Sequence, residues 1–219
     1  MIRVEDLSLT IGEASILRHV SFDIAPGKVT ALVGESGSGK SMTAFTVMGL
    51  QPRSAEVTGR VMLDDRNLLD AGEKQLNRIR GNRIGMIFQE PMTALNPVKT
   101  IGDQVAETLL IHGKASRAEA HRIAAEKLTR VGLPPDRFPL SRFPHELSGG
   151  QRQRVAIAMA IALSPELLIA DEPTTALDVT TQAQILDLLN ELVDESGMSL
   201  LLITHDLAVV AGMADRIIV

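Results

Sequence analysis

A glycine-rich segment of eight residues has the residue types and the spacing that bind a phosphate group. It consists of Gly34, Glu35, Ser36, Gly37, Ser38, Gly39, Lys40 and Ser41, and it fits the pattern G-x-x-x-x-G-K-[ST] without a mismatch. Glycines let backbone N–H groups converge on phosphate oxygens, and a helix that begins at the end of the segment adds its positive dipole. Lys40 would neutralise β- and γ-phosphates, and the Ser41 hydroxyl would bind Mg²⁺. The bland alternative is a Gly/Ser-rich turn.

An acidic pair follows the apolar run at residues 167–170. At the end of a buried strand, Asp171 would hold Mg²⁺ directly or through water. Glu172, the next residue, would orient or deprotonate the water that attacks a γ-phosphate. Acidic pairs at strand ends are also common as solvated edges, but the phosphate-binding segment in the same chain favours the functional interpretation.

A third candidate is the sequence LSGGQ before an apolar helical stretch. Its polar and glycine residues are Ser148, Gly149, Gly150 and Gln151. A serine and two glycines that open a helix form a second anion-binding helix N-terminus. Taken alone, the same residues favour a flexible Gly-Gly hinge.

The elements that must position these residues follow from the apolar pattern. Continuous apolar runs predict buried strands at 29–33, 83–88, 167–170 and 199–204, with helices between them, which indicates an α/β fold. Strand signals vanish from 91 to 163, where Ser116 and Glu119 form a capping box. We therefore expect residues 1–90, with an N-terminal β region, and 164–219 to form one core around a helical insertion at 91–163. Residues 59–65 predict a hairpin on the flank of the core.

Composition excludes several classes of protein. The chain has 219 residues, no cysteine, a net charge of −5 and only 2% aromatic residues. Disulfides, thiolate nucleophiles and Cys-bound metals are therefore excluded. The chain has no excess of basic residues that would indicate a nucleic-acid partner. The longest apolar run has nine residues against the roughly 20 that a membrane span needs. We expect no signal peptide, and we expect the C-terminus, which ends in the strand-like DRIIV, to be truncated.

The motifs and their order resemble the nucleotide-binding subunits of ABC transporters over nearly the whole chain. GESGSGKS resembles the Walker A loop, LLIADE the Walker B strand with its catalytic glutamate, and LSGGQ the signature motif. By this resemblance, Gln89 is the glutamine that contacts Mg²⁺ and faces the membrane subunit, Asp178 belongs to the D-loop, and His205 senses the γ-phosphate. Read without the resemblance, these three residues are a polar strand end, a helix cap and a capping or core imidazole.

The resemblance implies a RecA-like P-loop NTPase core with an inserted all-helical subdomain. It also implies ATP and Mg²⁺ as ligands, with two ATPase subunits, identical or paralogous, that meet head to tail. Transmembrane permease subunits would carry the solute. This chain would lie as a peripheral subunit at the cytoplasmic face of the inner membrane and would touch neither the solute nor nucleic acid. FQEPMTALNP and FPHELSGGQRQR are similar to the importer branch for di- and oligopeptides, which includes nickel importers. The aromatic residue that usually stacks on adenine is replaced by Ile11.

Two alternatives belong to other classes of protein. One is a non-transport ABC-type ATPase that acts on nucleic acid or the ribosome. The chain lacks the long heptads, zinc modules and basic arms that interrupt such proteins. The other is a nucleotide kinase or binding module that uses only the phosphate loop, which leaves LSGGQ and His205 without a role.

Overall fold

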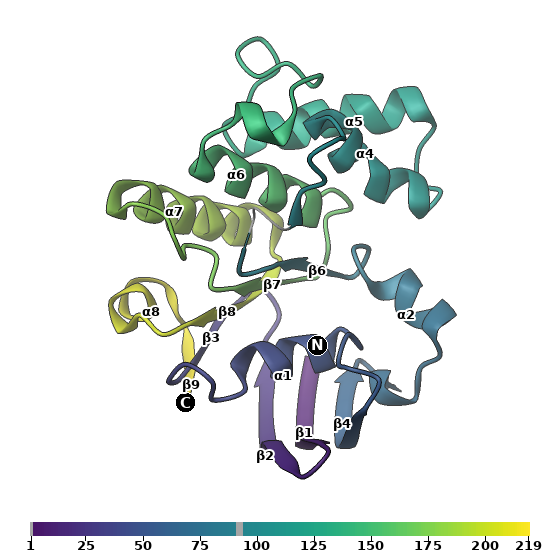
Figure 1. The fold of residues 1–219 in the computed structure, drawn as a ribbon, viewed down its shortest axis with the longest axis vertical. Coiled ribbons are helices and arrows are strands. Elements are labelled where there is room, and N and C mark those ends of the chain that lie inside the picture. The colour runs from purple at the N-terminus through teal and green to yellow at the C-terminus, as the bar shows by residue number, and fades with distance from the viewer. Residues whose placement is uncertain (1, 91–93) are drawn as a thin grey trace.

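The computed structural model describes residues 2–90 and 94–219 of the chain. A five-stranded parallel sheet has the strand order β6-β7-β8-β3-β9. Its strands are β3 (Val29–Val33), β6 (Ile84–Ile87), β7 (Leu167–Asp171), β8 (Ser199–Thr204) and β9 (Arg216–Ile218). The four strands expected from apolar runs are present, and the C-terminal run contributes the edge strand β9 (Figure 1).

A second sheet is antiparallel, with the strand order β2-β1-β4-β5. Its strands are β1 (Ile2–Ile11), β2 (Ala14–Ile24), β4 (Ala55–Leu63) and β5 (Arg66–Asn67). The segment 59–65, expected as a hairpin, supplies part of β4 and the turn into β5. However, β4 pairs along its whole length with β1, from far earlier in the chain. This pairing was not predicted, because the alternation within one segment does not specify its partner strand.

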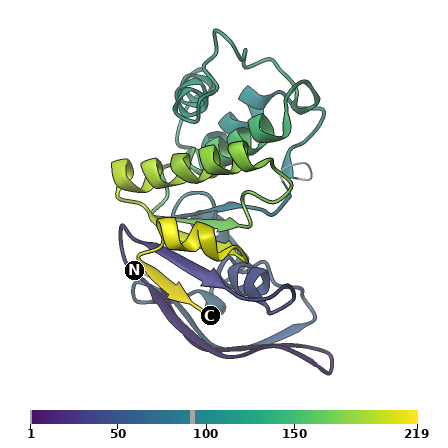
Figure 2. The ribbon, with the colours of Figure 1, turned by 90° about the vertical axis from the view of Figure 1, so that its left-hand side faces the viewer.

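Helices flank the parallel sheet and form the insertion. They are α1 (Lys40–Val47), α2 (Glu73–Ile79), α4 (Ile101–Ile111), α5 (Arg117–Arg130), α6 (Gly149–Ala160), α7 (Val179–Ser196) and α8 (Leu207–Met213), with 3₁₀ turns at Leu68–Asp70 and Pro144–Glu146. Between β6 and β7, residues 94–163 form helices and no strand. Figure 2 shows these helices at one end of the molecule and the antiparallel sheet at the other. Pro91, Met92 and Thr93, where the insertion is expected to begin, lie outside the described residues.

The three central strands of the parallel sheet are buried on both faces, as continuous apolar runs predict. Every residue of β3, β7 and β8 is buried. Because successive side chains of a strand point to opposite faces, Leu168 packs in one apolar cluster with the helices α4 to α7. Ile169 packs in a second cluster with α1 and the antiparallel sheet. Helices α1 and α6 therefore lie on opposite faces of the parallel sheet.

A histidine with two acceptors joins α4 to α5. His121 Nδ1 lies 2.9 Å from the carbonyl oxygen of Arg117, and its Nε2 lies 3.0 Å from Asp103 Oδ1. Only the imidazolium can donate both hydrogen bonds. The Arg117 carbonyl, followed by the Asp103 carboxylate, therefore raises the pKa of His121. Hydrogen bonds from the Thr100 hydroxyl and from His121 lower the pKa of Asp103.

This pair predicts a pH-dependent stability of the helical region. Because the pKa of His121 is raised above its ordinary value of 6.5, its contribution is complete below pH 6.5 and is lost as pH rises through the folded-state pKa. Asp103, with a pKa below 3.8, loses its contribution only in stronger acid. We expect His121→Gln to lower the melting temperature by about 2 °C near pH 5.5 and by less near pH 8.5, since partly exposed pairs contribute at most about 1 kcal/mol. If the difference in melting temperature between His121→Gln and the wild type does not change with pH, the prediction is wrong. The control is the double variant Asp103→Asn/His121→Gln, which removes both ionisable groups of the pair.

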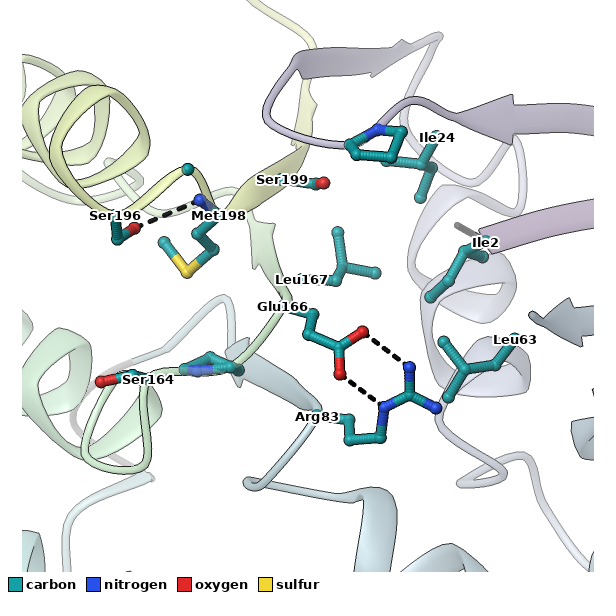
Figure 3. A pocket seen from close by; sticks show the side chains of 13 residues that line it. Ile2, Ile24, Leu63, Arg83, Ser164, Glu166, Leu167, Ser196, Met198 and Ser199 are labelled. Carbon is teal, nitrogen blue, oxygen red and sulfur yellow. Dashed lines mark hydrogen bonds and ion pairs between the residues drawn. The ribbon is translucent and has the colours of Figure 1, made fainter.

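An arginine at the amino ends of the parallel strands joins the two sheets. Arg83 Nε and Nη2 donate to both carboxylate oxygens of Glu166, at 2.7 and 2.6 Å, and Nη2 also donates to Asp64 Oδ2 at 2.7 Å. Asp64 lies in the turn between β4 and β5. The Arg83–Glu166 pair lines a pocket of about 310 Å³. Figure 3 shows Ile2 and Leu63 of the antiparallel sheet on one side of this pair. This edge of the sheet is opposite to the one that carries the candidate site.

Candidate functional site

The candidate residues gather at the carboxyl ends of the parallel strands. Gly34 follows β3, Gln89 lies just beyond β6, Asp171 ends β7 and His205 follows β8. In open α/β sheets, ligands bind at this edge because loops and helix N-termini converge there. Three of these strands, β6, β7 and β8, are direct neighbours in the sheet, which places the residues that follow them side by side.

The glycine-rich segment forms a loop that leads from β3 into α1. Gly37 and Gly39 have φ values of 81° and 92°, a left-handed region that glycine adopts without strain. The Lys40 ammonium, on a side chain that is largely buried, donates to the carbonyl oxygens of Gly34 at 2.9 Å and Glu35 at 2.8 Å. The cation is thus held across the loop that leads into the N-terminus of α1. This arrangement suits a polyphosphate and not a plain turn.

Ser41 and Asp171 meet from two separate elements. The Ser41 hydroxyl donates to Asp171 Oδ1 at 3.0 Å, and Asp171 is only 1% exposed. Burial raises the pKa of this carboxyl, the Ser41 hydrogen bond opposes that rise, and the charge of Glu172 adds to it. A hydroxyl and a carboxylate are hard oxygen donors of the kind that Mg²⁺ prefers, and a cation there would offset the desolvated charge. The pair therefore fits a magnesium ion bound jointly with phosphate oxygens.

The Glu172 carboxylate collects three partners. Its Oε2 accepts hydrogen bonds from Gln89 Nε2 and from the Thr175 hydroxyl, both at 3.0 Å. Its Oε1 lies 3.2 Å from His205 Nδ1. The structure therefore brings together the three residues expected to act in catalysis. Thr175 was not among the predicted residues, although its place three positions after Glu172 in a proline-containing turn was a local signal for it.

Gln89 was also predicted as a metal ligand. Its amide nitrogen binds Glu172 and not the Ser41–Asp171 pair. No three His, Asp or Glu side chains cluster as a metal site anywhere in the described chain. A contact of Gln89 with Mg²⁺ therefore stays a prediction for the nucleotide-bound protein.

The LSGGQ residues form a capped helix start and not a flexible hinge. Ser148 Oγ accepts from the Gln151 backbone N–H at 3.3 Å, and Gln151 Oε1 accepts from the Ser148 N–H at 2.9 Å. A Cβ atom at Gly150 would lie 2.5 Å from Thr181 Cγ2, so helix α7 excludes a side chain there. Gly149, one residue earlier, lies in the same first turn of α6. The N-terminus of α6 is thus fixed beside the start of α7.

Asp178 is the N-cap of α7. Its Oδ1 accepts from the Thr181 backbone N–H at 3.0 Å and its Oδ2 from the Thr181 hydroxyl at 2.7 Å. These hydrogen bonds, the hydroxyl's first, lower the pKa of the carboxyl. The structure thus gives Asp178 a capping role, and its expected contact with nucleotide stays a prediction.

Ile11 ends β1 at the tip of the β1–β2 hairpin, where it pairs with Ala14. Its half-buried side chain packs against the apolar cluster shared by α1 and the antiparallel sheet. The same hairpin touches the phosphate-binding loop: a Cβ atom at Gly39 would lie 2.6 Å from Leu17 Cδ2 and 3.0 Å from the Ile16 carbonyl oxygen. The hairpin therefore adjoins the loop, as an adenine-facing position requires.

Aromatic residues at position 11 are expected to tighten ATP binding. Stacking contributes roughly 1–3 kcal/mol per base in other aromatic–base systems, and we expect a gain of about tenfold for the best of Ile11→Phe, Ile11→Tyr and Ile11→Trp. Equilibrium dialysis with labelled ATP measures this, with the exposed Val98→Tyr as control. If none of the three variants binds more tightly, Ile11 does not face the base.

Comparison with known proteins agrees with this geometry. The family model for the ABC transporter matches residues 17–175. The chain belongs to the ABC transporter family. Among solved structures, this family member is similar to a dimeric ATP-binding cassette in a post-hydrolysis state bound to ADP and Pi. That likeness has a TM-score of 0.85 and 35% identity, and it covers 100% of this chain and 93% of the other. The expected α/β fold with a parallel sheet and helices is thereby confirmed.

Curated relatives of this ABC transporter family member are named for transport. The peptidoglycan transport ATP-binding protein YejF of Agrobacterium fabrum is 52% identical over 100% of this chain and 41% of its own length. A probable peptide transporter ATP-binding protein of Sinorhizobium fredii is 53% identical over 95% and 64%. The oligopeptide transport ATP-binding protein OppD of Escherichia coli is 46% identical over 100% and 66%. The chain thus spans about two fifths to two thirds of these relatives.

Proposed function

We propose that this chain binds ATP with Mg²⁺ and hydrolyses it to power the import of a solute, a di- or oligopeptide, through separate transmembrane permease subunits. The observation that carries the proposal is the convergence at one sheet edge of the Lys40 loop, the Ser41–Asp171 pair and the Glu172 cluster. Each of these three parts has a distinct task in phosphoryl transfer to water.

The loop and its lysine bind the phosphates. When ATP enters, the Lys40 ammonium exchanges its carbonyl partners for β- and γ-phosphate oxygens, and the backbone N–H groups of the loop bind the remaining oxygens. Ser41 and Asp171 would hold Mg²⁺, which supplies neutralisation of the phosphate charge. Gln89 would reach the same region once its amide leaves Glu172.

Glu172 and His205 act on the attacking water. The Glu172 carboxylate accepts a proton from this water while the water oxygen bonds to the γ-phosphorus and the bond to the β-phosphate oxygen breaks. The His205 imidazole lies 3.2 Å from Oε1 without nucleotide and would turn to bind the γ-phosphate. The products are ADP and inorganic phosphate.

Two copies or paralogues would enclose the nucleotides. Helices α1 and α6 lie on opposite faces of the sheet, so Lys40 and Ser148 of one chain would serve different nucleotides. The γ-phosphate alone reaches both helix N-termini, and ATP but not ADP therefore has the differential affinity that closes the dimer. The similar cassette bound to ADP and Pi is named as dimeric, which supports the pairing of two such chains.

An apolar groove beside Gln89 supports contact with a permease. The groove encloses about 300 Å³ between the end of α1, strand β6 and helix α6. Methionines line it, and Leu50 and Phe88 are each 41% exposed there. Methionine side chains adapt to an apolar partner segment.

No helix in the described parts of the chain has the length and apolar character needed to span a membrane. We place the chain at the cytoplasmic face of the membrane, as a peripheral subunit.

The solute class rests on the relatives. Their names state peptide, oligopeptide and peptidoglycan transport, which supports a peptide rather than nickel as the cargo. This chain would contact the permease and the second ATPase subunit, and neither the solute nor nucleic acid.

The proposal is tested by ATP turnover with defined partners. The purified chain is assayed alone, with proteoliposomes that hold the permease subunits encoded beside it, with DNA and with ribosomes. We expect turnover to rise severalfold with the permease vesicles only. Stimulation by DNA or ribosomes without stimulation by the permease would assign the chain to the non-transport class. Phosphoryl transfer to an acceptor other than water would indicate a kinase.

A further inference from the structure

The turn after β7 fixes the direction in which Glu172 leaves the sheet. Glu172 has a φ of 45°, in the left-handed region, and its backbone N–H donates to the Ile203 carbonyl at 2.9 Å. The turn closes three residues later, where the Thr175 N–H donates to the Glu172 carbonyl at 3.1 Å. Buried Pro173 between them restricts the backbone further. The backbone of Thr175 is therefore held at a set position relative to Glu172.

The Thr175 side chain also binds Glu172, as its backbone does. Its hydroxyl donates to Glu172 Oε2 at 3.0 Å, the same oxygen that accepts from Gln89 Nε2. Gln89 and His205 come from the ends of other strands, and the His205 side chain is 64% exposed. Of the three partners, Thr175 is the one that the local backbone ties to Glu172, so its hydrogen bond persists when Gln89 and His205 turn towards a nucleotide.

We propose that Thr175 is a positioning residue for ATP hydrolysis, whose hydroxyl holds Oε2 of Glu172 so that the rest of the carboxylate faces the attacking water. The inference rests on the proposed function. With Thr175 on Oε2, the other oxygen, Oε1, is left to accept the proton of the water once His205 has turned to the nucleotide. Without the hydroxyl, the three side-chain torsions of Glu172 are held only by partners that move.

The expected effect follows from the cost of misplacing a catalytic group. Displacement of about 1 Å can lower a rate by about 100-fold, and loss of one of several restraints has a smaller effect. We expect Thr175→Val, which keeps the β-branched shape and removes the hydroxyl, to lower kcat about tenfold and to leave the KM for ATP within about twofold. Thr175→Ser, which keeps the hydroxyl, is expected to retain kcat within about threefold.

The experiment compares these variants with a neighbour in the same turn. Thr174→Val is the matched control. Among the hydrogen bonds of the described residues, the one to the Glu172 carboxylate from this turn comes from the Thr175 hydroxyl and not from Thr174. ATP turnover and the melting temperature are measured for each variant. Thr175→Val is also combined with Glu172→Gln, where we expect no further loss of turnover, because the two residues act through one group. If Thr175→Val does not fold, the comparison of Thr175→Ala with Thr175→Ser replaces it.

The outcomes separate this inference from the proposed function. If the wild-type chain does not hydrolyse ATP, the proposed function fails. If the wild type is active and Thr175→Val matches it, or if Thr175→Ser is as slow as Thr175→Val, the positioning role is overturned. A fall in kcat for Thr174→Val as large as for Thr175→Val would assign the effect to the turn as a whole, and this also overturns the role of the hydroxyl.

Discussion

Glu172→Gln is expected to bind ATP with near wild-type affinity and to hydrolyse it at least about 100-fold more slowly, because an amide cannot accept the proton of the attacking water. The substitution preserves the local geometry. The amide oxygen of glutamine can still accept the hydrogen bonds of Gln89 and Thr175, which converge on Oε2. The exchange of one carboxylate oxygen for an amide nitrogen therefore removes ATP turnover and leaves ATP binding intact.

Phosphate release and equilibrium dialysis with labelled ATP measure the two quantities for Glu172→Gln. The matched control is Glu191→Gln on helix α7, an exposed carboxylate whose recorded partner is Arg130. The control is expected to bind and hydrolyse ATP as the wild type does. A fall in turnover of less than about tenfold for Glu172→Gln would show that this residue is not the general base.

A mixture of Lys40→Ala and Ser148→Arg is expected to regain ATP-dependent pairing that each variant lacks alone. Lys40 begins α1 and Ser148 caps α6, and the parallel sheet separates the two helices. If each nucleotide lies between Lys40 of one chain and Ser148 of another, a mixed pair contains one site with both defects and one intact site. If each site is built within a single chain, the mixture contains no intact site.

Light scattering in a Glu172→Gln background measures this pairing without turnover. About half of the pairs in an equal mixture contain one variant of each kind, so recovery is partial. Ser148 is exposed, which leaves room for the arginine, and loss of its cap costs about 1 kcal/mol. The control replaces Lys40→Ala with Lys74→Ala, a change at an exposed lysine on α2. Lys74→Ala is expected to show ATP-dependent pairing on its own, with no second variant in the sample. A mixture that pairs no better than either variant alone would exclude shared sites in a homodimer.

The sequence alone determined the features that depend on neighbouring residues. A phosphate loop is one short segment with glycines, a lysine and a hydroxyl at fixed spacing, so residues 34–41 were predicted from the sequence alone. Ser116 and Glu119 were predicted to form a capping box from their spacing. In the structure Ser116 is the N-cap of α5, and its hydroxyl accepts from the Glu119 backbone N–H at 3.4 Å. The central strands β3, β7 and β8 were predicted because burial on both faces requires continuous apolar runs.

The tertiary structure decided which distant residues meet. Gln89, Glu172 and His205 form one cluster because β6, β7 and β8 are neighbours in the sheet, and local sequence does not specify strand order. The antiparallel sheet depends on the pairing of β4 with β1, and that sheet places Leu17 against Gly39 of the phosphate loop. Each of these segments has an apolar pattern that many other strands or loops could pack against. Only the packing of both sheets on one apolar core selects the partners that build the site.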